Sequence, residues 1–296
     1  MSSTTPVRTR EVLTRAAELS GVDAEGATVI REGSHAIFEL PHGVIARIGE
    51  PHSYDAALRE IRISQWLNRS GIRAVEAVPS VPQPTVVEDR SVTWWRLIPD
   101  HRPSTPAELG TMLRRLHALT APTEFQLPSY TPLSELRERI ESAIAIDRSD
   151  RAWLLDHFTR LLQQYDELSV PTTQPVIHGD AWQGNLVVPR SGDPVLLDLD
   201  KVSIGRREWD LVQLAVDHTD FQRITDSQYQ QFVDAYGGYD VTHSPNYRLL
   251  ADIQELRWVG FAISRSAAGR AATTEAEHRI ACLRGLIPKP WTWTAL

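Results

Sequence analysis

The amino-acid sequence predicts an α+β fold of two lobes, a small β-rich first lobe and a larger, mainly helical second lobe. Before Pro99 the apolar residues form short strand-like runs with few helical stretches, whereas beyond Pro103 most of the apolar spacing is helical. The segment 99–103 carries two prolines and charged residues and interrupts both patterns. We therefore expect one lobe at residues 1–99 and a second lobe at residues 100–296.

The first lobe is expected to begin with a short amphipathic helix and to continue mainly as strands. Turn-forming residues, Gly33-Ser34 and Pro41-His42-Gly43, separate the first three strands. Strands packed with a helix form a small α+β unit. In chain order we expect a helix at 7–20, strands at 27–31, 36–40 and 44–48, a helix at 54–68 and a strand at 92–98.

The second lobe opens with a helix-start signal. Ser104 or Thr105, followed by Pro106, provides an N-cap and a first-turn proline for a helix that runs to about residue 119. A β-rich stretch at 175–200 interrupts the helical pattern. Further helices are expected at 132–145, 149–167, 206–218, 226–236, 246–266 and 272–285.

Composition limits the class of protein. The chain has 296 residues, 42% of them hydrophobic, which is enough for a packed core. Its single cysteine, Cys282, excludes an internal disulfide and a cysteine-based metal cluster. The net charge of −7 argues against a nucleic-acid partner, and no apolar run is long enough to span a membrane. The N-terminus lacks a basic start and an apolar core, so we expect a cytoplasmic protein.

The strongest chemical pattern lies between residues 176 and 200. A short apolar run ends at His178-Gly179-Asp180, and Asn185 follows after four residues. A second apolar run, a turn and a third run then lead to Asp198. Two acids and an amide are thus carried on adjacent loops by buried strands.

Phosphoryl transfer requires this set of groups. One acid must orient and deprotonate the acceptor hydroxyl, while oxygen ligands hold Mg²⁺ against the nucleotide phosphates. Asp180 suits the first role, and Asn185 and Asp198 suit the second. An isolated His-Gly-Asp is equally compatible with a tight turn, so the interpretation depends on the other positions.

The complete pattern resembles the aminoglycoside phosphotransferase and choline kinase branch of the protein-kinase-like fold. The motif of that branch is H-G-D-x-x-x-x-N, followed by an apolar strand that ends in aspartate. The resemblance implies an ATP- and Mg²⁺-dependent kinase of a small-molecule hydroxyl, with Asp180 as the catalytic residue. Asn185 and Asp198 take the metal positions, because the spacing favours Asp198 over Asp200. Asp200 then has a supporting role.

Two further residues receive supporting roles from the same resemblance. His178 is expected to hold the loop by hydrogen bonding and not to act as the base. In Glu208-Trp209-Asp210-Leu211, Asp210 corresponds to an aspartate that braces the catalytic loop.

The first lobe resembles the nucleotide lobe of this family more loosely. Ser34 lies in a loop that resembles the phosphate-facing loop, although an ordinary hairpin turn explains it equally well. Arg47 stands where the family has a lysine, and Glu60 is its expected ion-pair partner. No lysine occurs in residues 1–99. Ile98 approaches the segment where the adenine edge would bond to backbone groups.

The acceptor side is less sharply defined. Acids and a tryptophan near the catalytic loop would suit a cationic or sugar-like acceptor, and a solvated helix face with a core tryptophan is an equal alternative. The candidate acceptor-binding residues are Asp217, Asp252, Glu255 and Trp258.

Three functions compete. The first is a kinase whose acceptor is an amino sugar, an aminoglycoside-like antibiotic or a related metabolite. The second is a nucleotide-binding pseudokinase or regulator in which Arg47 has ended catalysis. The third, a protein kinase, is disfavoured because no long activation segment separates Asp198 from Asp210.

Overall fold

The computed structural model describes residues 6–31, 35–169 and 173–296, and the chain divides into two compact units. The first unit runs as far as Ser104 and also includes Gln183–Val202, whereas the second comprises Thr105–Trp182 and Ser203–Leu296. The boundary thus lies a few residues beyond the predicted one. Residues 183–202, which the sequence predicts in the second lobe, belong to the first unit, because their strands pair with residues of that unit.

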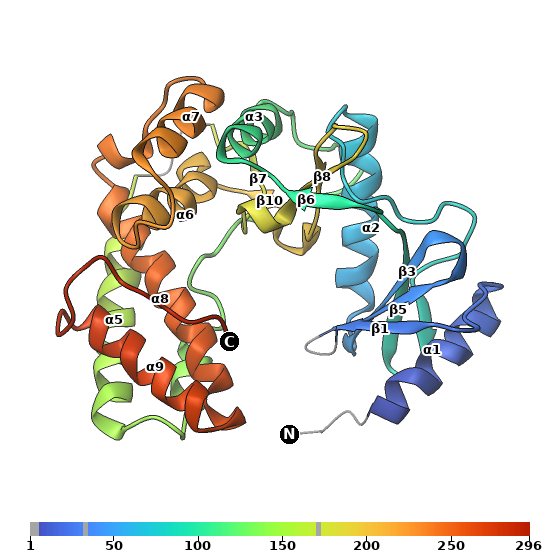
Figure 1. Cartoon of the computed structure of the whole chain (residues 1–296), viewed down its shortest axis with the longest axis horizontal. Coiled ribbons are helices and arrows are strands. Elements are labelled where there is room, and N and C mark those ends of the chain that lie inside the picture. Colours follow the sequence, from blue (N-terminus) through green and yellow to red (C-terminus); the bar gives the residue numbers. More distant parts are fainter. Residues whose placement is uncertain (1–5, 32–34, 170–172) are drawn as a thin grey trace. The chain divides into compact units, whose positions relative to one another are not determined.

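The first unit is built on a five-stranded antiparallel sheet with two helices (Figure 1). Its elements are α1 (Pro6–Ser20), β1 (Thr28–Arg31), β2 (Ala36–Leu40), β3 (Val44–Pro51), α2 (Tyr54–Arg69), β4 (Thr85–Val87) and β5 (Arg90–Arg96). The strands lie in the order β1-β2-β3-β5-β4. The predicted elements are present, and β4 is an additional strand that the sequence pattern did not indicate.

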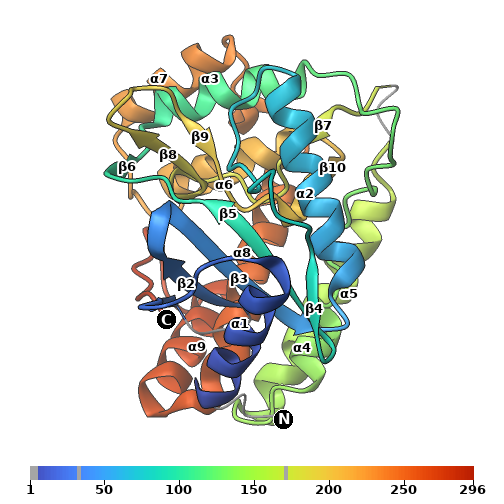
Figure 2. The ribbon, with the colours of Figure 1, turned by 90° about the vertical axis from the view of Figure 1, so that its right-hand side faces the viewer.

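The pairing of the strands decides which side chains share a face of this sheet. Phe38, Ala46 and Trp94 are paired across β2, β3 and β5, and all three are buried. They form one core with residues of α1 such as Leu13, and Figure 2 shows α1 lying against the sheet. Since neighbouring residues of a strand point to opposite faces, Arg47 lies on the face away from α1.

A second, smaller sheet of the first unit carries the segment 183–202. It consists of β6 (His101–Pro103), β8 (Leu186–Pro189) and β9 (Val195–Leu196), in the order β6-β8-β9. Two short 3₁₀ turns, η2 (Gln183–Asn185) and η3 (Leu199–Lys201), lie immediately before β8 and after β9. The Val75 N–H donates to the Leu196 carbonyl at 2.9 Å, which joins β9 to the chain that follows α2.

The second unit is mainly helical. Its elements are α3 (Pro106–His117), α4 (Leu136–Glu141), α5 (Arg148–Asp166), β7 (Val176–Ile177), β10 (Ser203–Ile204), α6 (Arg207–Thr219), α7 (Asp226–Tyr236), α8 (Tyr247–Arg265) and α9 (Arg270–Leu283). Strands β7 and β10 pair in antiparallel register. The buried face of α8 contributes Ile253, Leu256 and Val259 to the main apolar core of this unit.

Some helix ends follow local signals in the sequence. Thr105 caps α3, and its side chain and that of Glu108 form a reciprocal capping box. Helix α4 is shorter than predicted because Glu135 adopts a positive φ of 62°, so the helix begins only after it. No helix among the described residues is long and apolar enough to cross a membrane.

Candidate functional site

Arg47 and Glu60 form a buried ion pair in the first unit. The Nη1 of Arg47, on β3, donates to Oε1 of Glu60, on α2, at 2.6 Å. The two side chains are only 17% and 9% exposed. Burial pushes the pKa of the Glu60 carboxyl upward, and the Arg47 guanidinium opposes this rise. The ion pair expected from the sequence is therefore present.

His35 lies next to this pair, and the sequence reasoning did not assign it a role. Its Nε2 is 3.5 Å from Nη2 of Arg47. Burial, together with the Arg47 charge, lowers the pKa of His35 to about 4, so the imidazole is neutral at pH 7. The only signal was its position directly after the Gly33-Ser34 turn. Ser34, the predicted phosphate-facing residue, lies outside the described residues.

The β8–β9 hairpin brings Asn185 and Asp198 to the same end of the small sheet. The Leu197 N–H donates to the Asn185 carbonyl at 2.8 Å, so the pairing continues one step beyond the strands. Asp198 follows with a φ of 52°, in the left-handed region that aspartate tolerates better than most residues. Asn185 is buried, whereas the Asp198 side chain is 46% exposed.

These side chains line one cavity of about 470 Å³, all of whose lining residues belong to the first unit. Ile98, the residue predicted to lie beside the nucleotide base, also lines it, and its carbonyl accepts a hydrogen bond from Nδ1 of His101 at 2.7 Å. The polar residues of the lining are Arg31, His35, Arg47, Glu60, Arg96, His101, Asn185, Asp198 and Asp200.

The donor set of this cavity fits a divalent cation that arrives with phosphate oxygens. Asn185 offers an amide oxygen, and Asp198 and Asp200 offer carboxylates. Mg²⁺ is usually held by one or two carboxylates, with water and phosphate oxygens completing its shell. Within residues 6–31, 35–169 and 173–296, no cluster of three or more His, Cys, Asp and Glu side chains could hold a metal by itself. Asp200 also lies 3.6 Å from Nζ of Lys201.

Asp180 lies in the second unit, on the loop that follows β7. Gly179 precedes it with a φ of 83°, a conformation that favours glycine. The ring of the fully buried His178 accepts the Asp180 N–H at Nδ1, at 3.3 Å. Asp180 itself is half-buried. The loop is therefore held partly by its own histidine, which is the contact expected of a supporting residue.

The buried carboxylate of Asp210, on α6, holds the same loop. Its oxygens accept the N–H groups of His178 at 2.6 Å and Gly179 at 2.8 Å, so the predicted bracing contact is present. Oδ2 is also 3.0 Å from Nε2 of His117, on α3. The other ring nitrogen of His117 lies 2.8 Å from the Tyr236 hydroxyl. Three connected side chains, those of Asp210, His117 and Tyr236, thus support the loop.

The Gly179 carbonyl is fixed as firmly as its N–H. It accepts hydrogen bonds from the Tyr130 hydroxyl at 2.9 Å and from Nε1 of Trp209 at 3.1 Å. The two rings pack with their centroids 5.2 Å apart. The sequence reasoning did not assign these donors. Trp209 could have been suspected from its place beside Asp210, whereas Tyr130 lies in a connecting segment that gives no signal.

Two of the candidate acceptor-binding residues have partners within the second unit. The Asp217 carboxylate, 18% exposed, accepts from Nη1 of Arg223 at 2.7 Å. Burial raises its pKa, and Arg223 opposes this. Trp258 packs edge-on against Phe221 and Trp293, with centroid distances of 5.6 and 6.2 Å. These contacts place Trp258 in an aromatic cluster, which agrees with the core alternative.

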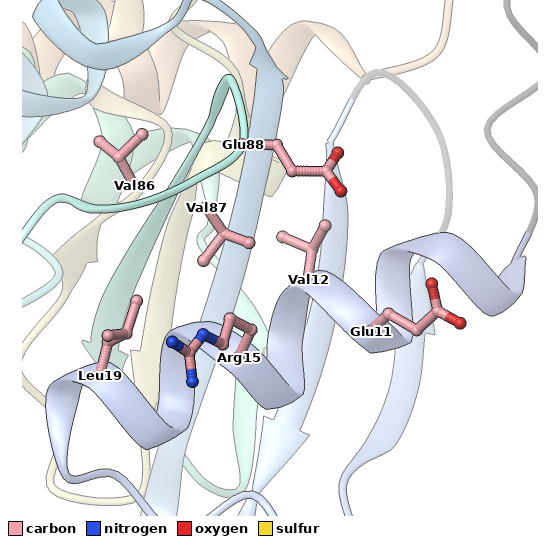
Figure 3. A pocket seen from close by; sticks show the side chains of 7 residues that line it. All are labelled: Glu11, Val12, Arg15, Leu19, Val86, Val87 and Glu88. Carbon is pink, nitrogen blue, oxygen red and sulfur yellow. The ribbon is translucent and has the colours of Figure 1, made fainter.

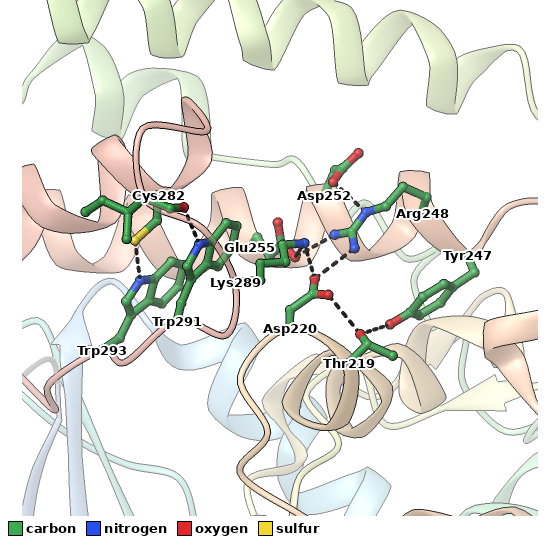
Figure 4. Close-up of polar contacts among 11 residues, drawn as sticks. Thr219, Asp220, Tyr247, Arg248, Asp252, Glu255, Cys282, Lys289, Trp291 and Trp293 are labelled. Carbon is green, nitrogen blue, oxygen red and sulfur yellow. Dashed lines mark hydrogen bonds and ion pairs between the residues drawn. The ribbon is translucent and has the colours of Figure 1, made fainter. Parts of the chain in front are cut away.

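The other two candidates, Asp252 and Glu255, belong to an ion-pair network on α8 (Figure 4). Arg248 bonds to both carboxylates, at 2.8 Å to Asp252 and 2.5 Å to Glu255. It also bonds to Asp220 at 2.8 Å, and Lys289 reaches Asp220 at 2.7 Å. The Glu255 side chain is only 3% exposed. These two carboxylates, predicted to bind the acceptor, are therefore bonded to cations of the chain itself, in a network of three carboxylates and two cations.

A second cavity, of about 430 Å³, lies between α1 and the β4–β5 hairpin (Figure 3). Its walls combine apolar residues such as Val12 and Leu19 with Glu11, Arg15 and Glu88. Arg15 pairs with Glu18 at 2.9 Å, and Glu88 pairs with Arg8 at the same distance. The charged groups at this cavity are surface ion pairs, so it lacks the amide and carboxylate set of the first cavity.

Solved structures with the same architecture are kinases and phosphotransferases. The amicoumacin kinase hAmiN, in complex with AMP-PNP, Ca²⁺ and Ami, aligns over 94% of both chains with a TM-score of 0.71 and 14% identity. The spectinomycin phosphotransferase APH(9)-Ia, in complex with ADP and spectinomycin, aligns over 94% of both chains with a TM-score of 0.64 and 13% identity. The choline kinase LicA from Streptococcus pneumoniae covers 93% of this chain and 99% of its own, with a TM-score of 0.63 and 14% identity. The protein-kinase-like α+β fold predicted from the sequence is therefore confirmed.

Sequence comparison defines the family. The model of the phosphotransferase enzyme family matches residues 22–252, well over half of the chain. A probable ketoamine kinase from Lactiplantibacillus plantarum is 30% identical over 105 residues, a segment that covers 34% of this chain and 36% of that relative. The family model defines the class as a phosphotransferase. The chain belongs to the phosphotransferase enzyme family, as the resemblance implied.

Proposed function

We propose that this phosphotransferase moves the γ-phosphoryl group of ATP to a hydroxyl of a small molecule. The observation that carries the proposal is the cavity of about 470 Å³ in the first unit. It gathers the Arg47–Glu60 pair with the amide of Asn185 and the carboxylate of Asp198, the groups that nucleotide phosphates and a divalent cation require.

Each residue takes a role that its surroundings support. Arg47 presents positive charge to the phosphates, since its Nη1 is held by Glu60 and its planar guanidinium suits phosphate oxygens. Asn185 and Asp198 would hold Mg²⁺, which supplies neutralisation of charge on the transferring group. Asp180 orients the acceptor hydroxyl and accepts its proton. Its position is fixed because both the N–H and the carbonyl of the preceding residue, Gly179, are hydrogen-bonded.

Support for a small-molecule acceptor comes from the relatives. Those with the same fold include an amicoumacin kinase, a spectinomycin phosphotransferase and a choline kinase, and the sequence relative is a probable ketoamine kinase. We propose the same broad class here, a hydroxylated compound such as an amino sugar, an aminoglycoside-like antibiotic or a related metabolite.

The test is the substitution Asp180→Asn, compared with Asp156→Asn at an exposed position of α5. ADP formation is measured with Mg²⁺ and ATP across amino sugars, aminoglycosides, peptide antibiotics, choline-like alcohols and hydroxy amino acids. We expect Asp180→Asn to lower turnover about 1,000-fold, because it removes the proton acceptor. Nucleotide affinity, measured with a fluorescent ATP analogue, should change little. Full turnover by this variant would refute the assignment.

The pseudokinase remains the second candidate because Arg47 replaces the family lysine. It is distinguished by the wild-type chain in the same assay. Magnesium-dependent binding of ATP without transfer to any acceptor class would favour the regulator. Transfer to any of them would exclude it.

A further inference from the structure

Arg257, on α8, lies beside the loop that carries Asp180. Its guanidinium carbon is 5.1 Å from the centroid of the Trp209 ring. The Nε1 of the same ring donates to the carbonyl of Gly179, the residue before Asp180. Burial raises the pKa of Tyr130, Arg257 opposes this rise and Asp180 adds to it, so both charges act on the same phenol. Arg257 and Asp180 are therefore neighbours within the second unit.

The position of Arg257 is fixed by neutral groups. Its Nη1 donates to Oε1 of Gln254 at 3.0 Å, and Nε2 of Gln254 lies 3.4 Å from Oε1 of Gln213, on α6. Gln254 is almost fully buried. The guanidinium lies over the Trp209 ring, and the planar group carries further N–H donors besides the Nη1 that bonds to Gln254. This arrangement holds the side chain in place and leaves most of its donors unused by the contacts just described.

The charge of Arg257 is not matched within the part of the chain that the structure describes. There, Arg223 and Arg248 each bond to a carboxylate, whereas Arg257 has no ion-pair partner and is half-buried. A half-buried cation without a counter-ion is unfavourable unless a ligand supplies one.

The carboxylates predicted to bind a cationic acceptor do not pair with Arg257, because they are engaged elsewhere. Asp217 is paired with Arg223, and Asp252 and Glu255 are both bonded to Arg248. Asp210 is fully buried and accepts the loop N–H groups. Among the described residues Arg257 is thus a cation beside the Asp180 loop without an ion-pair partner, whereas the candidate acids are each bonded to a cation of the chain.

We propose that Arg257 binds a carboxylate of the acceptor, so that the acceptor carries this anionic group in addition to the hydroxyl that receives the phosphoryl group. The proposal rests on the proposed function, because it names the class of compound that Asp180 would orient. A guanidinium edge and a carboxylate match in a planar, bidentate pair. Arg257 would therefore set the orientation of the acceptor as well as its charge.

The test uses the full chain, Mg²⁺, ATP and acceptors that differ in one group. Glucuronate, glucose and glucosamine form one set, and L-homoserine and its carboxamide form another. Arg257→Gln and Arg257→Lys are compared with Arg265→Gln, which removes a charge from the same helix where the guanidinium lies over Phe261. Steady-state kinetics is combined with calorimetric binding of each compound in the presence of a non-hydrolysable ATP analogue.

We expect the carboxylate compounds to be preferred, and Arg257→Gln to weaken their binding and kcat/KM about 100-fold. Values for neutral compounds should stay within about twofold, Arg257→Lys should be intermediate, and Arg265→Gln should behave as the wild type. An equal loss of kcat for all acceptors would show that Arg257 only supports Trp209 and would overturn the proposal. So would a wild-type chain that shows no preference for carboxylates in binding or in turnover.

The two proposals fail in different ways. Binding of carboxylates that depends on Arg257, without phosphoryl transfer, would refute the proposed kinase function and leave the binding site standing. Transfer confined to neutral or cationic acceptors would refute the carboxylate site and leave the kinase standing. Asp180→Asn should lower transfer about 1,000-fold while it preserves the Arg257-dependent binding.

Discussion

At the scale of single residues, Arg47 has the largest consequence for the proposed chemistry. It occupies β3 opposite Glu60 and keeps the ion pair in a setting where both side chains are mostly buried. Its Nη2 also lies 3.9 Å from the Asp198 carboxylate. A guanidinium reaches several oxygens from one fixed plane, whereas an ammonium acts as a compact point charge. One arginine can therefore face Glu60 and the cavity together.

We expect Arg47→Lys to retain turnover within about tenfold, because charge and pairing survive. Arg47→Met should abolish turnover and lower the free energy of unfolding by about 3 kcal/mol, since it leaves the Glu60 carboxylate buried without its partner. Urea unfolding and steady-state kinetics measure the two effects. Adding Glu60→Gln to Arg47→Met should restore stability and not turnover. Equal stability of Arg47→Met and the wild type would contradict this account.

At the scale of elements, the loop that carries Asp180 is held in place by residues of three helices and of a connecting segment. Helix α6 supplies Asp210 and Trp209, α3 supplies His117, and α7 ends with Tyr236. The bonds converge on the peptide groups of residues 178 and 179. The loop therefore keeps its shape only while these elements are packed together.

We expect His117→Leu to destabilise the chain by about 2 kcal/mol, because it removes a bond from a buried carboxylate. Turnover should fall as well, since Asp210 then holds the loop less firmly. Tyr236→Phe removes only the outer bond of the same chain and should cost about 1 kcal/mol with little change in turnover. Thermal unfolding and kinetics of both variants check the order. A larger effect of Tyr236→Phe than of His117→Leu would show that the hydrogen bond of His117 to Asp210 is not what supports the loop.

The sequence predicted those parts of the site that depend on local spacing. The step from Asp180 to Asn185 and Asp198, and the strand-to-helix relation of Arg47 and Glu60, are short-range patterns. Tyr130 could not be predicted, because its contact with the loop depends on how a connecting segment packs. The partners of the candidate acceptor acids could be predicted only in part, for a related reason. Spacing on α8 shows that Arg248 can reach Asp252, whereas the approach of Lys289 comes from the C-terminal segment.

At the scale of the whole molecule, half-buried histidines make the folded state sensitive to acid. His35 in the first unit and His157 in the second both have a pKa lowered to about 4, chiefly by burial. An unfolded chain protonates them near pH 6.5, whereas the folded chain does so only near pH 4. The folded state therefore binds fewer protons in this window, and stability is lost as pH falls through it.

We expect His35→Gln to reduce this loss of stability between pH 6.5 and pH 4, relative to the wild type. His157→Gln, in the other unit, is the matched comparison and should act in the same direction. The midpoint of thermal unfolding, measured at half-unit steps of pH, gives the difference curves. A difference curve that is flat for His35→Gln would mean that the imidazole is protonated normally in the folded chain.

The scarcity of lysine has a consequence for how the protein can be detected. Only Lys201 and Lys289 carry side-chain amines, and β3 offers a guanidinium at the position where reagents that acylate a nucleotide-site lysine would react. Lys201, 50% exposed and beside Asp200, is the sole side-chain amine of the first unit. Activity-based profiling with amine-directed ATP probes would thus report on Lys201 or miss the protein, and chemistry directed at arginine would be the better choice for labelling its cavity.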